Sequence, residues 1–463
     1  MHTPYSAHQR FLPSLSLVLL IALLGSVWLA GGASRGDALG QVVVRGVAWI
    51  LLIAAILLGA RPTLGQARPV WIIVLAALAL ALIQLIPLPP EIWAALPGRT
   101  LLLEANAASG QAQVWRPWAI VPGATLNAAS SLIVPLTALI LITGLRETER
   151  MLLPGMLLGI VGASMMLGLG QFSGLTFSNP LVNDTIGMVS GNFANRNHFA
   201  LFMAMGCLLA PVWIFLPRHR SVGRGLIGLG LVLLFFLNLL ASGSRAGLGL
   251  GVVALLLGLF LVWRPLRREL AAYPRWVFPT LVVSLLSMVV LFVVMSVAVG
   301  RAISIDRLFA LDQSQDMRTR GVPIVWSMIQ DYFPLGTGMG SFNTMFRIHE
   351  PMGFLTLTYF NHAHNDVLEV VLDAGLPGLF LLLGAIGWWG RASAVAWRAR
   401  ESRHDALPKL GSAILFLVIV ASLFDYPMRT PMMMAVTIIA AIWLSDAKKP
   451  PQGSSLPRQS QHL

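Results

Sequence analysis

Charge and cysteine are scarce in this sequence of 463 residues. Asp, Glu, Lys and Arg make up 11% of it, whereas hydrophobic residues make up 56%. A soluble globular protein carries about 25% charged residues, so the composition excludes a cytosolic enzyme. A disordered chain is excluded because it would contain far fewer apolar side chains. The single cysteine, Cys207, excludes an intramolecular disulfide and a cysteine-based metal site. The composition therefore predicts an all-α polytopic membrane protein.

Several motifs are absent as well. No Asp-x-Asp pair occurs, so the commonest divalent-metal motif of sugar transferases is missing. Gly336, Gly338 and Gly340 resemble a phosphate-cradling loop, but no Gly-Lys-Ser/Thr sequence accompanies them. This favours a tight turn over nucleotide binding. No internal repeat is visible, whereas many transporters are built from repeated halves.

Long apolar runs dominate the rest of the chain. A spanning helix needs about 20 mostly apolar residues, and windows of that kind predict about twelve transmembrane helices in a single integral-membrane domain, residues 1–446. The tail, residues 447–463, is polar and proline-containing, and we expect it to be disordered and cytoplasmic. The predicted spans cover residues 11–30, 42–60, 70–87, 126–145, 151–171, 193–216, 223–241, 246–263, 277–299, 367–389, 408–424 and 431–446.

The positive charge of the chain indicates its orientation. A net charge of +13 would indicate nucleic-acid binding in a soluble protein. Here most of the 32 Lys and Arg residues fall in the segments that share a side with the N-terminus. Because short cytoplasmic loops collect Lys and Arg, both termini are predicted to be cytoplasmic. The charge therefore predicts membrane lipids as neighbours and no nucleic-acid partner.

Two segments on the opposite side are too long to be simple turns. Residues 88–125 contain Trp93, Trp115 and Trp118, which suit a stretch that lies at the membrane interface. The segment from about residue 300 to residue 366 is the largest polar block and is rich in aromatic residues. Long loops in compact proteins are usually functional, so we expect this loop to be folded.

Arg245 lies in a Ser-Gly-Ser-Arg-Ala-Gly turn, residues 242–247, between two predicted spans. An arginine at the membrane boundary is costly unless it snorkels, pairs or meets an anionic ligand. A snorkelling arginine at a helix end is one interpretation. The alternative is an anion site, since the neighbouring Gly and Ser residues leave room and offer backbone donors.

The segment before the tenth predicted span contains His362 and His364. Asn365 or Asp366 can cap the helix that follows, and Glu369 falls in its first turn. A neutral imidazole can act as a general base near pH 7, and Glu369 or Asp366 could orient it. Capping and loop hydrogen bonding are the alternative. A metal site is disfavoured because no third ligand is evident.

Other charged residues gather near the predicted outer face. Arg318 and Arg320 can grip a pyrophosphate through bidentate contacts, or they can pair with the nearby acidic residues of the same loop. Arg196 begins the sixth predicted span. In the turn between the last two spans we expect Asp425 to pair with Arg429, because only three residues separate them.

These pieces together resemble the bacterial O-antigen ligase and O-antigen polymerase superfamily. The most specific match is His364-Asn365 followed, after nine residues, by Gly-Leu-Pro-Gly at residues 375–378. The resemblance extends over roughly residues 80–445. Further blocks that are similar to the family are residues 84–90, 244–247, 334–342 and 425–427.

The resemblance implies a class C glycosyltransferase-like fold and a glycan donor carried on undecaprenyl diphosphate. It implies that Arg245, with Arg318 or Arg320 and with Arg196 as a further contact, binds the diphosphate. It also implies that His364 deprotonates the acceptor hydroxyl in an inverting reaction without metal or other cofactor, since arginines can stabilise the leaving group. Supporting roles fall to Asn365, Glu369 and His362.

The acceptor is left open by the sequence. O-antigen ligation to lipid A-core at the periplasmic face of the inner membrane is the first expectation. A growing polysaccharide chain, as in polymerases, or a protein hydroxyl, as in O-oligosaccharyltransferases, are the alternatives. A transporter or flippase of lipid-linked glycans is an alternative of a different class, which the lack of a repeat disfavours.

Overall fold

The described part of the chain is almost entirely helical. The computed structural model describes residues 12–59, 62, 65–111, 113–183, 187–217, 221–276, 313–355, 360–399 and 405–447, with a few residues between 279 and 294. In these ranges the only strands are β1 (Pro87–Leu88) and β2 (Arg116–Pro117), which pair antiparallel. The helices are α1 (Leu15–Ala30), α2 (Leu39–Leu58), η1 (Gly65–Ala67), α3 (Arg68–Ile83), α4 (Pro90–Ala94), α5 (Thr100–Ala108), α6 (Pro122–Ser131), α7 (Ile133–Thr143), α8 (Glu147–Arg150), α9 (Leu153–Ser173), α10 (Arg196–Phe215), α11 (Val222–Ser242), α12 (Arg245–Leu261), α13 (Trp263–Leu270), α16 (Gln313–Tyr332), α17 (Phe342–His349), η2 (Met352–Phe354), α18 (Asp366–Arg398), α19 (Ala406–Ser422), η4 (Pro427–Arg429) and α20 (Pro431–Ser445).

Every predicted span except residues 277–299 coincides with a described helix. Six helical segments are long and apolar enough to cross a membrane, and the pair α12–α13, bent by 69°, would make a seventh. The helices α1, α3, α19 and α20 are apolar but shorter. These findings confirm the all-α membrane class, while the total of twelve spans stays a prediction. The segment 277–299 falls largely, and the tail 448–463 entirely, outside the described residues.

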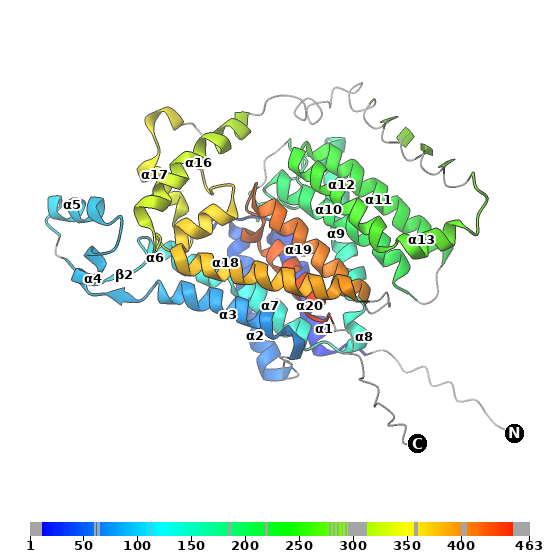
Figure 1. Ribbon diagram of the computed structural model, residues 1–463, viewed down its shortest axis with the longest axis horizontal. Helices are drawn as coiled ribbons and strands as arrows, with labels where there is room; N and C mark the ends of the chain where they lie inside the picture. The colour runs from blue at the N-terminus through cyan, green and yellow to red at the C-terminus, as the bar shows by residue number, and fades with distance from the viewer. Residues whose placement is uncertain are drawn as a thin grey trace, which may run out of the picture.

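Helix α10 is the centre of the bundle. It packs against α9, α11, α12 and α19. In Figure 1, α9 to α12 lie together at the right, α19 lies nearer the middle, and the long helix α18 crosses in front of α20. The side chains of α10 are buried on every face, including Phe199 and Phe202. A helix that is apolar all round belongs in the core of an assembly. Helix α10 therefore holds its N-terminal residues in a fixed place for the site described below.

The loop that precedes α18 is folded where it is described. Helices α16 and α17 pack with η2 and the start of α18 around a second apolar cluster, apart from the main bundle (Figure 1). The aromatic rings of Phe342, Phe346, Phe354 and Phe360 contact one another in this cluster. This finding agrees with the expectation of a folded loop. Residues 300–312 and 356–359 lie outside the described chain.

The two ends of the described chain meet at one face. The backbone N–H and the hydroxyl of Ser14, just before α1, both donate to the buried carboxylate of Glu149 at 2.7 Å. Arg150, the next residue of the same short helix, lies 3.9 Å from Asp446, just after α20. The start of α1 and the end of α20 therefore share a side of the molecule, as the charge distribution predicts.

Candidate active site

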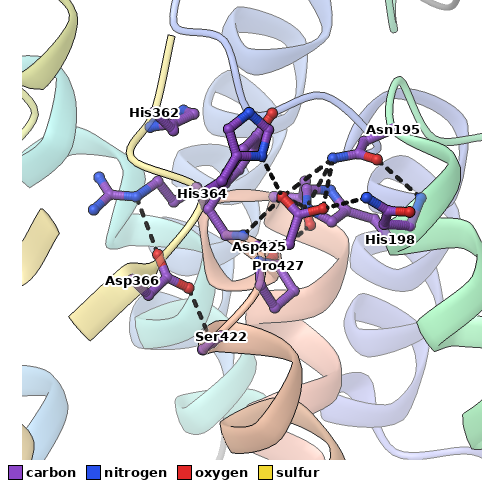
Figure 2. A network of polar contacts seen from close by, with 12 residues as sticks. Asn195, His198, His362, His364, Asp366, Ser422, Asp425 and Pro427 are labelled. Atoms are coloured by element: carbon purple, nitrogen blue, oxygen red, sulfur yellow. Dashed lines mark hydrogen bonds and ion pairs between the residues drawn. The ribbon is translucent and has the colours of Figure 1, made fainter. Parts of the chain in front are cut away.

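Helix ends from distant parts of the chain meet in one polar cluster. It is formed by the start of α10, the start of α12, the loop before α18, the turn between α19 and α20, and α16. Figure 2 shows Asp425 between His364 on one side and Asn195 and His198 on the other. The sequence predicts all of these ends on the same side of the membrane. Their convergence agrees with that topology.

Asp425 lies at the centre of the cluster. Its Oδ2 atom accepts hydrogen bonds from the side-chain amides of Asn197 at 2.7 Å and Asn195 at 3.2 Å. Its Oδ1 atom lies 3.7 Å from Nε2 of His198 and 3.3 Å from Nδ1 of His364. The guanidinium of Arg318 lies 3.8 Å from Oδ2. Asp425 is therefore a buried carboxylate that two imidazoles and one arginine share.

The surroundings of Asp425 keep it ionised. Burial by itself disfavours the carboxylate, but the contacts with His198 and His364 outweigh it and hold the pKa of Asp425 well below its ordinary value. An anionic carboxylate beside an imidazole stabilises the imidazolium form, as in a general-base dyad. The cluster therefore carries the negative charge that a proton-accepting histidine needs.

His364 has an unusual backbone conformation. Its φ angle is 51°, in the left-handed region, which costs a residue with a side chain about 1–2 kcal/mol. Its ring packs against Phe360 and against Tyr426, at centroid distances of 5.2 Å and 4.9 Å. The side chain remains 15% exposed, unlike the buried ring of His198. Of the two histidines beside Asp425, His364 is the one that a substrate can reach.

His362 belongs to a different carboxylate. Its Nδ1 atom lies 2.8 Å from Oε1 of Glu369, which also accepts the backbone N–H of Ala363 at 2.8 Å through Oε2. Burial lowers the pKa of His362 although Glu369 opposes the shift, so this imidazole is neutral near pH 7. A carboxylate can only accept, so the neutral ring donates its Nδ1–H to Glu369. Glu369 thus orients His362, and the carboxylate facing His364 is Asp425.

Arg429 does not pair with Asp425, and that expectation was wrong. Its guanidinium lies 3.3 Å from Asp366, 3.1 Å from Glu369 and 4.0 Å from Asp373, all on α18. The 3-10 turn η4 ends at Arg429, and the Arg429 side chain is directed toward α18. Ser422 also donates to Asp366 at 2.9 Å (Figure 2). The side chains of Asp425 and Arg429, both in the turn between α19 and α20, therefore contact different partners.

Asn365 caps α18, as predicted. Its side-chain oxygen accepts the backbone N–H of Leu368 at 3.0 Å, and its amide donates to the carbonyl of Leu423 at 3.1 Å. The cap begins the helix directly after His364. Asn365 therefore limits how far the His364 backbone can move.

The glycine loop before α17 is a tight turn whose described donors are already used. The backbone N–H groups of Thr337 and Gly338 donate to carbonyls of α18, and Gly340 donates to the carboxylate of Asp373 at 2.9 Å. Met339 donates to the side chain of Gln84 at 2.9 Å. A Cβ atom at Gly336 would meet the carbonyl of Asp373 at 2.8 Å. The geometry agrees with the tight turn and leaves these amides unavailable to a phosphate.

The four candidate arginines occupy different places. Arg196 and Arg245 are the first residues of α10 and α12, and both are partly buried. The hydroxyl of Ser244, which caps α12, donates to the side-chain oxygen of Asn197 at 2.8 Å, so the turn of Arg245 is joined to the Asp425 cluster. Arg318 contacts Asp425 itself. Arg320 lies over the ring of Phe354 and donates to the carbonyl of Gly353 at 3.4 Å.

Four side chains of the cluster were not among the predicted site residues, namely those of Asn195, Asn197, His198 and Asp425. No role was predicted for His198, whereas Asp425 was expected to pair with Arg429 and lies in the family-like block of residues 425–427. A small recess beside them is lined by Asn197, Gly247, Leu250 and Phe424, together with His198 and Asp425. A histidine in the first turn of an otherwise apolar span was the available signal for His198.

The described residues contain no group of three or more His, Cys, Asp or Glu side chains arranged to hold a metal ion. The positive charges that the site offers to an anion are those of arginine side chains. Fold and site together define a multi-pass, all-α membrane protein with a histidine–carboxylate–arginine cluster built from helix ends.

Residues 229–383 match the family model described as O-antigen ligase, which confirms the resemblance to the O-antigen ligase superfamily. The matched segment is shorter than the predicted range of residues 80–445. It contains Arg245, Arg318, Arg320 and the loop of His362 and His364, whereas Asp425 lies outside it. No curated protein matches the chain. The family match supports glycan transfer of the O-antigen ligase or polymerase type.

Proposed function

We propose that this protein is an inverting, metal-independent glycosyltransferase that moves a glycan from undecaprenyl diphosphate to an acceptor hydroxyl at the periplasmic face of the inner membrane. The observation that carries the proposal is the contact between His364 and the ionised Asp425, with Arg318 beside them. It brings together an imidazole that can accept a proton and a guanidinium that can bind a phosphate. The match of residues 229–383 to the O-antigen ligase family model supports glycan transfer as the general type of reaction.

His364 is the general base in this proposal. Its Nδ1 atom faces Asp425, so the Nε2 atom takes the proton of the acceptor hydroxyl. The acceptor oxygen then forms the new bond to the anomeric carbon from the face opposite the diphosphate. The old carbon–oxygen bond breaks, and its electron pair leaves with the diphosphate. Asp425 stabilises the imidazolium that results, and such a base contributes about 10²–10⁴-fold to a rate.

The arginines stabilise the leaving diphosphate. Arg318 is favoured over Arg320 for this role, because Arg318 reaches the Asp425 cluster whereas Arg320 is directed to Phe354 and Gly353. Arg245 contributes from the start of α12, and Arg196 from the start of α10. Guanidinium groups held beside the leaving diphosphate stabilise the negative charge that develops on it, as the donors of an oxyanion hole do. In this proposal the reaction therefore uses no metal ion and no cofactor.

The acceptor we propose is lipid A-core, which makes the reaction O-antigen ligation. Polymerisation of the glycan and transfer to a protein hydroxyl use the same base and the same arginines, and they remain the alternative acceptors. In this proposal the chain crosses the membrane about twelve times in a class C glycosyltransferase-like fold, with both termini in the cytoplasm.

A His364→Ala variant tests the chemistry. We expect glycan transfer to fall by at least about 10²-fold while the protein still reaches the membrane. His349→Ala is the matched control, because His349 contacts only Met345 and Tyr332 in the described cluster of α16 and α17. Full transfer by the His364→Ala variant would contradict the proposal. Mass spectrometry of lipopolysaccharide, polysaccharide and glycoproteins from a deletion strain identifies the acceptor.

A further inference from the structure

Arg429 joins two parts of the site that are far apart in the chain. Asp366, Glu369 and Asp373 have the spacing i, i+3, i+7, which places them on one face of α18. The guanidinium of Arg429 lies within 4.0 Å of all three carboxylates. One carboxylate would be enough to pair with one arginine. Three contacts along the helix balance the charge of the guanidinium and also fix its direction relative to the axis of α18.

Glu369 transmits this constraint to the segment that carries His364. The side chain of Glu369 is 0% exposed, and each of its oxygens is engaged. One oxygen meets Arg429 and His362, and the other accepts the backbone N–H of Ala363. The two residues directly before His364 are therefore fixed to the carboxylate that Arg429 holds. Because His364 has a left-handed backbone, it needs such support from both sides.

The turn that carries Arg429 also carries the partner of His364. Asp425 and Tyr426 come just before η4, and the backbone N–H of Arg429 donates to the carbonyl of Tyr426 at 3.2 Å. The Tyr426 ring packs against His362 at 4.3 Å and against His364 at 4.9 Å between centroids. A shift of this turn along α18 would therefore change the distance between Asp425 and His364.

We propose that Arg429, acting through Glu369, is a positioning residue that sets the geometry of the His364–Asp425 pair. The inference rests on the function proposed above, and it assigns Arg429 no contact with substrate. A single guanidinium fixes the base on one side and its carboxylate on the other. A displacement of about 1 Å between reacting groups can lower the rate about 10²-fold.

Arg429→Lys is the informative variant. It keeps the buried positive charge, so the three carboxylates are not left without a counter-ion. The ammonium of lysine is a compact charge on a flexible stem and lacks the rigid planar fork of a guanidinium, so it holds the three carboxylates in a less defined geometry. We expect kcat to fall by about 10²-fold, with KM for the lipid-linked donor changed by less than about twofold, because the diphosphate contacts are elsewhere.

The pH profile separates positioning from a merely structural role. His364 is faced by Asp425, Arg318 and Tyr426, and His198 shares the same carboxylate. When Asp425 moves away, it stabilises the imidazolium less. The acid limb of the kcat/KM profile, that is, the fall in kcat/KM toward low pH, should therefore move to lower pH in the Arg429→Lys variant. Glu369→Gln, which keeps the shape but removes the charge, should shift the limb in the same direction.

Arg150→Lys is the matched control, because Arg150 pairs with Asp446 at the other end of the bundle and is about as exposed as Arg429. It should keep both the rate and the profile. Wild-type kcat in Arg429→Lys, or a loss that matches the loss of folded protein with an unshifted profile, would overturn the inference. If His364→Ala is inactive in the same assay, that outcome overturns the positioning role alone. If His364→Ala is active, the proposed function fails first.

Discussion

Two histidines, separated by one alanine, contact two different carboxylates in this protein. His362 and Glu369 form a short, closed pair at 2.8 Å, and Arg429 neutralises the carboxylate at the same oxygen, Oε1, that His362 contacts. His364 and Asp425 form a longer contact at 3.3 Å, and Asp425 is shared with His198 and Arg318. The carboxylate of this closed pair is held by Arg429, whereas the carboxylate of the His364–Asp425 pair, the open pair, also contacts Arg318, which the proposed function assigns to the diphosphate.

The comparison teaches that closeness of a histidine to a carboxylate does not by itself indicate a base. Burial lowers the pKa of His362 and keeps it neutral, with its Nδ1–H directed to Glu369. Asp425 is instead held ionised by its neighbours. A base needs an anionic partner and access to substrate. The two side chains are similarly exposed, at 14% for His362 and 15% for His364, so their partners distinguish them. The carboxylate beside His364 also contacts Arg318, the arginine proposed to bind the diphosphate. In the proposed function, the closed pair fixes the loop and the open pair carries the chemistry.

Asp425→Asn should have the largest effect, because it removes the charge from the open pair and leaves its shape. We expect kcat/KM to fall by about 10²–10⁴-fold. Since the pKa of Asp425 lies well below its ordinary value, the wild-type carboxylate is ionised throughout the working pH range. The amide cannot stabilise an imidazolium, so the acid limb of the profile moves to lower pH.

Transfer assays from pH 5 to 9 in detergent or liposomes measure this effect. Asp446→Asn is a suitable control, because it removes a carboxylate from the pair with Arg150, away from the cluster. A rate within a few fold of wild type for Asp425→Asn would show that the open pair is not the base.

Arg318→Ala and Arg320→Ala should differ, although the residues are separated by a single position. Arg318 contacts Asp425, and its loss should lower kcat by about 10²–10³-fold if it meets developing charge on the diphosphate. Arg320 lies over Phe354 at 5.5 Å, where a cation–π contact contributes little at an exposed site. The Arg320→Ala variant should stay within a few fold of wild type. Equal losses would contradict the assignment of Arg318 over Arg320.

The helices could be predicted from the sequence because the apolar runs that form them are local. Each predicted span outside residues 277–299 coincides with a helix. The cap at Asn365 followed from its position directly before an apolar segment. His364 was singled out as the base through its resemblance to a family motif, and the structure places it beside a carboxylate and an arginine. Local patterns and motif spacing thus predicted most of the helices and singled out His364, but not its partner Asp425.

The partners in the site could not be predicted, because they depend on how distant turns pack. The sequence favoured a pair between Asp425 and Arg429 since they are close in the chain, but the Arg429 side chain is directed toward α18. One usable signal was present in α18, where Asp366, Glu369 and Asp373 fall on a single helix face. Three acidic residues on one face of an apolar helix require a buried cation. The sequence did not reveal which cation.

His362→Leu should have only a small effect on catalysis and should sharpen the contrast between the two pairs. The variant leaves Glu369 with one partner fewer, which should cost about 1–3 kcal/mol of stability, while Arg429 and the N–H of Ala363 still hold the carboxylate. We expect kcat to fall by less than about tenfold, with the acid limb unmoved. Burial depresses the pKa of His362 from an ordinary value of 6.5, so the unfolded chain binds its proton first as the pH falls. Wild-type stability should therefore decline below about pH 6.5, and the part of this decline due to His362 should be absent from the variant. Thermal unfolding in detergent at pH 5 and pH 8 measures the difference, and a shifted acid limb in the transfer assay would show instead that the closed pair takes part in the chemistry.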